Sequence, residues 1–152
     1  VLVITQDVEA LMQVMNRVLP AALHARVHVK SASRAEVPDM LPSMDVLVSF
    51  IQPSYARIAA SPTKLAECFA EGIPAICNDG VGDVVVQIQQ LGAGIIIDPT
   101  SDDGLYAAIG RLDEVCAMGG QRLRDKAQPM LGLEFARKQY LDVYNNLTKD
   151  SG

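Results

Sequence analysis

Residues 49–83 read SFIQPSYARIAASPTKLAECFAEGIPAICNDGVGD, and this stretch decides the fold. Its pattern predicts a helix over residues 62–71 and a buried strand over residues 73–78. Gly72 after the helix and Pro74 soon afterwards are typical of a helix that stops sharply before a strand. Two further glycines, Gly80 and Gly82, indicate a turn into another helix. A helix, a strand and a turn in this order are the repeating unit of a parallel α/β sheet.

The rest of the chain extends the same alternation. Each predicted strand is a nearly continuous apolar run, as expected for strands covered on both faces, and the five runs are residues 1–5, 25–30, 45–50, 73–78 and 93–98. Helical patterns are found at residues 7–19, 34–44, 62–71, 82–91, 102–117, 119–128 and 132–148. This order predicts a Rossmann-like parallel sheet with helices on both faces, and we expect one domain over residues 1–152.

Composition excludes several classes of protein. The net charge of −5 argues against a general nucleic-acid-binding protein, which needs clustered Lys and Arg to neutralise phosphates. The three cysteines are an odd number without a CxxC pair, which favours reduced thiols in a cytosolic protein over a disulfide framework. No apolar run approaches the roughly 20 residues of a membrane span. The chain begins inside an apolar run without an initiator Met, so we expect a fragment or an excised domain.

The sequence Ser61-Pro62-Thr63-Lys64 is a candidate phosphate site. Ser at the N-cap and Pro at the first helical position predict a helix start. The amides of Thr63, Lys64 and Leu65 would then lack partners within the helix, and the helix dipole would favour an anion there. An ordinary capped helix, with Ser61 occupying one amide itself, is the competing interpretation.

Three further features of the same stretch fit a nucleotide ligand. Glu67 lies four residues after Thr63, on the same helical face, where its carboxylate could accept hydrogen bonds from a ribose diol. Arg57, in the loop of residues 51–61, could bind a diphosphate with two hydrogen bonds. The turn Gly80-Val81-Gly82-Asp83 could let a ligand approach the backbone. Each also has an ordinary explanation: a solvated Glu, a surface Arg and a tight strand-to-helix turn.

The segment SPTKLAExxAxGIPAICN, followed by GVGD, resembles the C-terminal, donor-binding domain of family 4 glycosyltransferases, also called the group 1 family. The resemblance extends over residues 1–147, and the helix cap, carboxylate, helix stop and glycine turn occur in the family's order. It implies the C-terminal half of an enzyme with two Rossmann-like domains, which transfers a sugar from a nucleoside diphosphate sugar to an acceptor hydroxyl with retention of configuration.

The resemblance also assigns site residues. Glu67 matches a family glutamate that binds the ribose hydroxyls, and the helix start at Ser61, Pro62, Thr63 and Lys64 matches the diphosphate site. The loop that holds the base matches Lys30, Ser31, Ala32 and Ser33. No metal and no cofactor beyond the sugar nucleotide is expected. The acceptor, a glycan or a lipid-linked sugar, would bind the other domain at the cytoplasmic face of a membrane, with the protein at most peripherally attached.

Two departures from the family pattern put the activity in doubt. The family places a first glutamate eight residues before Glu67, where this chain has Ala59. Residues 1–5 match the family's second strand, with Gln6 and Asp7 in place of the usual glycines, so we expect the first strand-helix unit upstream of Val1.

Other functions stay open at this point. A sugar-nucleotide epimerase shares the architecture but needs catalytic acids and histidines, and His24 and His28 are the only histidines here. A degenerate, non-catalytic domain is a third possibility because of Ala59. A phosphoacceptor receiver domain and a dinucleotide-binding domain both fit poorly, the second because no GxGxxG follows the first strand. An apolar face on the last predicted helix would let two copies of the fragment associate.

Overall fold

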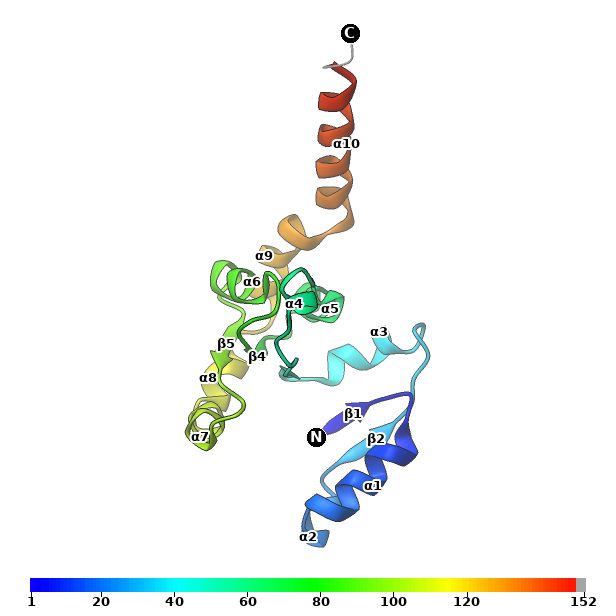
Figure 1. Ribbon diagram of the computed structural model, residues 1–152, viewed down its shortest axis with the longest axis vertical. Coiled ribbons are helices and arrows are strands. Elements are labelled where there is room, and N and C mark those ends of the chain that lie inside the picture. Colours follow the sequence, from blue (N-terminus) through cyan, green and yellow to red (C-terminus); the bar gives the residue numbers. More distant parts are fainter. Residues whose placement is uncertain (150–152) are drawn as a thin grey trace. The chain divides into compact units, whose positions relative to one another are not determined.

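A computed structural model describes residues 1–149 and divides the chain into two compact units, residues 1–42 and the residues from Ser43 onward (Figure 1). Each unit is an assembly of short parallel strands and helices. The units are described separately below.

The first unit is a two-stranded parallel sheet with helices. Strand β1 (Leu2–Ile4) pairs with β2 (His28–Lys30), with Leu2 opposite His28. Helix α1 (Val8–Val18) connects them, followed by the short α2 (Ala21–His24). Asp7 caps α1 by accepting a hydrogen bond from the Ala10 amide at 3.0 Å. Helix α3 (Val37–Met40) and a 3₁₀ turn, η1 (Leu41–Ser43), follow β2.

The second unit is built on a three-stranded parallel sheet in the order β3 (Leu47–Ser49), β4 (Ala75–Asn78), β5 (Gly94–Ile97). Leu47 pairs with Ala75, and Ala75 pairs with Gly94. All four residues of the central strand β4 are buried. The helices of this unit are α4 (Tyr55–Ile58), α5 (Thr63–Ala70), α6 (Val84–Leu91), α7 (Asp102–Gly110), α8 (Leu112–Ala117), α9 (Gln121–Leu131) and α10 (Leu133–Lys149).

Two hydrophobic clusters cover opposite faces of the β3-β4-β5 sheet. Successive residues of a strand point to opposite faces, and accordingly Ala75 and Cys77 belong to one cluster and Ile76 to the other. The first cluster takes its helical side chains from α5, α6 and α9, with Phe69 completely buried. The second takes them from α7 and α8. Helices therefore cover both faces of a parallel sheet, which confirms the predicted fold class.

The predicted and observed elements agree closely, with a few differences. Every observed strand lies inside a predicted apolar run. Two four-residue helices, α2 and α4, were not predicted, and the helix expected at residues 102–117 is interrupted at Arg111. Helix α9 continues three residues beyond the predicted end, with Pro129 inside its last turn.

Helix α10 exposes apolar side chains, as expected from its pattern. Leu133 is 82% exposed and Tyr140 is 68% exposed. Among the described residues, no helix combines the length and the hydrophobicity needed to cross a bilayer.

Candidate functional site at the ends of strands β3 and β4

The predicted diphosphate, ribose and turn residues all lie in the second unit, at or beyond the carboxyl ends of β3 and β4. In open α/β sheets this edge is where ligands bind. Three segments meet there: the loop of residues 51–60 after β3, the start of α5, and the turn of residues 79–83 after β4.

The start of α5 differs by one residue from the prediction. Pro62, and not Ser61, is the N-cap, because its ψ of 104° is extended and helical geometry begins at Thr63. The Ser61 hydroxyl donates instead to the Asp83 carboxylate at 3.4 Å. The Leu65 amide is also not free, since it donates to the Pro62 carbonyl at 3.0 Å. This corrects the expectation that Ser61 caps the helix and that three amides are open.

The amides of Thr63 and Lys64 make no hydrogen bond within the described part of the chain, and no side chain caps the helix. The side chains of Thr63 and Lys64 are exposed. Two amides and an ammonium group at the positive end of a helix dipole can bind an anion from solvent.

Glu67 is exposed on α5, one turn after Thr63, while Leu65, Cys68 and Phe69 are buried in the core as predicted. Burial raises the pKa of the Cys68 thiol to about 11, with a further contribution from the Glu67 charge. The carboxylate of Glu67 is exposed one turn inside α5 and is accessible to a ligand.

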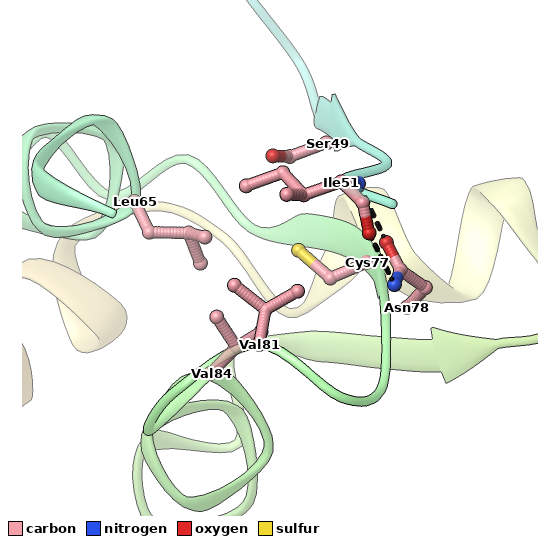
Figure 2. Close-up of a pocket in the computed structure, with 7 residues that line it drawn as sticks. All are labelled: Ser49, Ile51, Leu65, Cys77, Asn78, Val81 and Val84. Carbon is pink, nitrogen blue, oxygen red and sulfur yellow. Dashed lines mark hydrogen bonds between the residues drawn. The ribbon is translucent and has the colours of Figure 1, made fainter. Parts of the chain in front are cut away.

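Asn78 joins the ends of β3 and β4 (Figure 2). This buried side chain accepts a hydrogen bond from the Ile51 amide at 2.8 Å and donates to the Ile51 carbonyl at 2.9 Å. It also donates to the Asp79 carbonyl at 2.7 Å. Asn78 was not among the predicted site residues, although an amide side chain at the end of an otherwise apolar strand was a signal.

The space beside this pair is core and not a ligand site. Figure 2 shows the side chains of Ile51, Leu65, Val81 and Val84 converging near Cys77. They leave no room for a water molecule. Burial raises the pKa of the Cys77 thiol to about 12, as expected in such an apolar environment.

The glycine turn contacts the chain itself. Gly80 and Gly82 have φ of 81° and 44°, so both need the left-handed conformation that glycine adopts easily. A Cβ atom on Gly82 would lie 1.6 Å from the Ala60 carbonyl oxygen, and one on Gly80 would lie 2.9 Å from Pro53. The close approach that the glycines permit is therefore that of the 51–60 loop, which supports the tight-turn interpretation of Gly80 and Gly82.

The other two residues of the turn are also engaged. Val81 is buried in the core. Asp83 accepts hydrogen bonds from Ser61 and, at 2.6 Å, from the Gln87 amide group. Asp83 precedes α6 as its N-cap residue but makes no side-chain cap.

Arg57 lies beside an open hollow of about 390 Å³, whose walls are formed by Ile51, Gln52, Pro53, Ser54 and Arg57. Arg57 is the only charged residue of this lining, and its side chain is exposed. Gln52, Pro53 and Ser54 were not predicted as site residues. An arginine with amide and hydroxyl groups beside it can bind an anionic ligand.

The predicted base-binding segment belongs to the first unit, at the end of β2. Its backbone is already partly bonded: the Lys30 carbonyl accepts from Thr5 at 3.1 Å and the Ala32 carbonyl from the Gln6 side chain at 2.9 Å. The Ser33 amide donates to Glu36 at 2.7 Å, and hydrogen bonds from the side chain and the amide of Ser33 lower the pKa of that carboxyl. The side chains of Lys30, Ser31 and Ser33 are exposed, and Ala32 is buried.

No group of three or more His, Cys, Asp or Glu side chains within residues 1–149 is placed to hold a metal ion.

Comparison with known proteins identifies a structural relative. No family model and no curated protein matches the sequence. Among solved structures, the chain is similar to sucrose-phosphate synthase from Thermosynechococcus elongatus, with a TM-score of 0.64 and 21% sequence identity over 95% of this chain. It spans 34% of that chain. At this identity the similarity concerns the fold alone, which is the Rossmann-like α/β fold of about one third of that synthase.

Proposed function

We propose that the chain is the donor-binding domain of a retaining glycosyltransferase, which transfers a sugar from a nucleoside diphosphate sugar to an acceptor hydroxyl. The observation that carries this proposal is the start of α5, where the amides of Thr63 and Lys64 are open and the side chain of Lys64 is exposed. The similarity of fold to a sucrose-phosphate synthase supports it, as does the resemblance of residues 61–83 to the donor motif.

In this proposal each group binds the part of the donor that suits its chemistry. The two amides of α5 and the ammonium group of Lys64 would stabilise the charge that develops on the leaving diphosphate. Arg57 would bind the same group from the hollow after β3. Glu67 would accept hydrogen bonds from the ribose diol, and backbone groups of Lys30, Ser31, Ala32 and Ser33 would hold the base. No metal and no further cofactor enters this proposal.

The intact protein would bind its acceptor, a glycan or a lipid-linked sugar, on a second domain. We place the reaction in glycan or polysaccharide biosynthesis in the cytoplasm, with at most peripheral contact with the inner membrane face. The 152-residue chain alone should have little or no transferase activity, and its exposed α10 face is a candidate for homodimer formation.

One alternative has specific support. Ala59 is exposed at the position where the family motif has a glutamate, which favours a degenerate domain without catalytic function. The epimerase alternative has less support, because the His24 ring is hydrogen-bonded to the Leu19 carbonyl at 2.9 Å. His28 lies in β2, away from the proposed donor motif in sequence.

Calorimetric titration with UDP, GDP, ADP and CMP tests the donor site. We expect one nucleoside diphosphate to bind selectively. Because hydrogen bonds to charged groups contribute about 1.5–3 kcal/mol, Lys64→Ala and Glu67→Ala should each weaken binding by roughly tenfold to a hundredfold. Lys64→Ala should weaken that diphosphate more than the monophosphate of the same nucleoside, whereas Glu67→Ala should weaken both equally.

Matched controls are available on other helices. Lys126 and Glu134 are exposed on α9 and α10, and Lys126→Ala and Glu134→Ala should leave the affinity unchanged. Binding of no nucleotide would contradict the donor-site proposal and favour the degenerate domain. A loss for Lys126→Ala equal to that for Lys64→Ala would mean that the effect is one of net charge and not of the site.

A further inference from the structure

The loop of residues 51–60 has little structure of its own. Its helix α4 has only four residues and no side-chain cap, and residues 52–59 are all exposed. The backbone hydrogen bonds within it are local, from Arg57 and Ile58 to Ser54 and from Ala60 to Arg57. An isolated helical turn of this length is unstable in water. Contacts with other segments must therefore keep the loop in place.

The first of these contacts is at the beginning of the loop. Asn78 binds both backbone groups of Ile51, as a neighbouring strand would, although β3 has already ended at Ser49. Each neutral hydrogen bond contributes about 1 kcal/mol, and leaving a buried partner unsatisfied costs more. The side chain of Ile51 adds packing against the core.

The second contact is at the end of the loop. The Gly82 amide donates to the Arg57 carbonyl at 3.0 Å, and the Ala60 carbonyl lies where a Cβ atom of residue 82 would be. Between the two ends, Gly80 leaves room for the ring of Pro53. The turn after β4 thus contacts the loop at its beginning, middle and end.

We propose that residues 78–82 form a brace that holds the 51–60 loop, and that Asn78 is a positioning residue for Arg57. The brace contacts Arg57 directly, because the Gly82 amide donates to the Arg57 carbonyl. Asn78 holds the beginning of the same loop through its two hydrogen bonds with the backbone of Ile51. The role of Arg57 toward a diphosphate rests on the proposed function, whereas the brace does not.

Hydrogen–deuterium exchange on the full chain tests the brace. Asn78→Ala removes all three hydrogen bonds of the side chain, and Asn78→Ser is the milder change because it keeps a hydroxyl group that can hydrogen-bond. We expect the hydrogen-bonded amides of Arg57, Ile58 and Ala60 to exchange about tenfold to a hundredfold faster in Asn78→Ala, and less so in Asn78→Ser, because opening of the loop becomes easier as bonds are lost. Amides of α6 and α9 should keep their rates.

Gln87→Ala is the matched control, because it removes an amide side chain that bonds Asp83 beside the same turn without contacting the loop. The brace is refuted if the amides of Arg57, Ile58 and Ala60 exchange at the same rate in the Asn78 variants and in Gln87→Ala. If Asn78→Ala loosens the entire unit, the milder Asn78→Ser decides, and a uniform rise in exchange across α6 and α9 in that variant also refutes the brace.

A double-mutant cycle tests the positioning of Arg57. If Asn78 acts through Arg57, the diphosphate affinity of Asn78→Ser combined with Arg57→Ala should equal that of Arg57→Ala alone. Additive losses would overturn this role. If the unmodified chain binds no nucleotide, the proposed function fails, and the exchange experiment still decides whether the brace exists.

Discussion

Substitution of Gly82 by alanine tests whether this glycine is needed for packing against the 51–60 loop or leaves space for a ligand. Gly82 has a φ of 44°, and Gly92, the residue after α6, has a similar φ of 61°. The two differ in surroundings: a Cβ atom on Gly92 would meet nothing within 4 Å, whereas one on Gly82 would lie 1.6 Å from the Ala60 carbonyl oxygen. Gly92→Ala is therefore a control for conformational strain alone.

The expected magnitudes follow from this geometry. The left-handed conformation costs an alanine about 1–2 kcal/mol at either position. At position 82 the Ala60 carbonyl must also move by about 1.4 Å to reach the 3.0 Å below which real Cβ contacts are essentially never found. Such a shift disrupts the Gly82–Arg57 hydrogen bond, which adds about 1 kcal/mol, and further contacts of the loop. We expect a total of about 2–4 kcal/mol for Gly82→Ala.

Urea denaturation of the two variants and the unmodified chain measures these differences in the free energy of unfolding. Gly82→Ala should be less stable than Gly92→Ala by at least about 1 kcal/mol. Equal losses of stability would refute the reasoning, because the Ala60 carbonyl would then be free to move away without cost, and the glycine would be available for a ligand after all.

Three further predictions concern the core. Desolvation raises the pKa values of the buried thiols of Cys68 and Cys77 from the ordinary 9.0 to about 11 and about 12. A thiol reagent at pH 8 should therefore modify only the half-buried Cys116 until urea unfolds the chain. Modification of Cys68 or Cys77 at the rate of Cys116 would contradict this prediction. A raised pKa in the folded state means that the folded chain holds the thiol proton more tightly than the unfolded chain does. The resulting contribution to the free energy of unfolding is complete below about pH 9 and is lost as the pH rises toward 11 and 12. Urea titrations at several pH values would detect this loss of stability. Phe69→Ala should cost about 3–5 kcal/mol, because the ring is completely buried between α5 and the rest of the core. The matched Phe135→Ala on α10, where the side chain is 44% exposed, should cost less than about 1 kcal/mol in the same denaturation assay, and similar losses for the two would contradict the assignment of the core.

The strands and long helices were predictable because burial repeats along them. Residues 75–78 of β4 are buried on both faces, so the sequence is apolar without interruption up to Asn78. The short helices were not predictable because they bury too few residues to produce a periodic pattern. Helix α4 has one turn and no buried residue, so no periodic pattern marks it.

The candidate site was predictable as a segment but not in its internal contacts. The helix start at Thr63 and Lys64 follows from local signals, since Pro and a preceding polar residue mark it. The pairing of Asn78 with Ile51 joins residues 27 positions apart, and the approach of Ala60 to Gly82 joins residues 22 positions apart. Such pairs depend on how the β3 and β4 segments are placed side by side, which local patterns do not encode.

The contacts also explain why Ala59 is compatible with an intact fold. The brace uses the backbone of Ile51, Arg57 and Ala60, whereas the side chain at position 59 is exposed. A substitution at position 59 can therefore alter what the loop binds without altering where the loop lies. Asn78 and Gly82 have the opposite character, since their changes disturb the position of the loop first and the ligand only as a consequence. A substitution at Ala59 should change the nucleotide affinity and leave the exchange rates of the loop unchanged, whereas substitutions of Asn78 and Gly82 should change both. Comparing the two measurements therefore distinguishes a donor site that lost one carboxylate from a loop that never held a ligand.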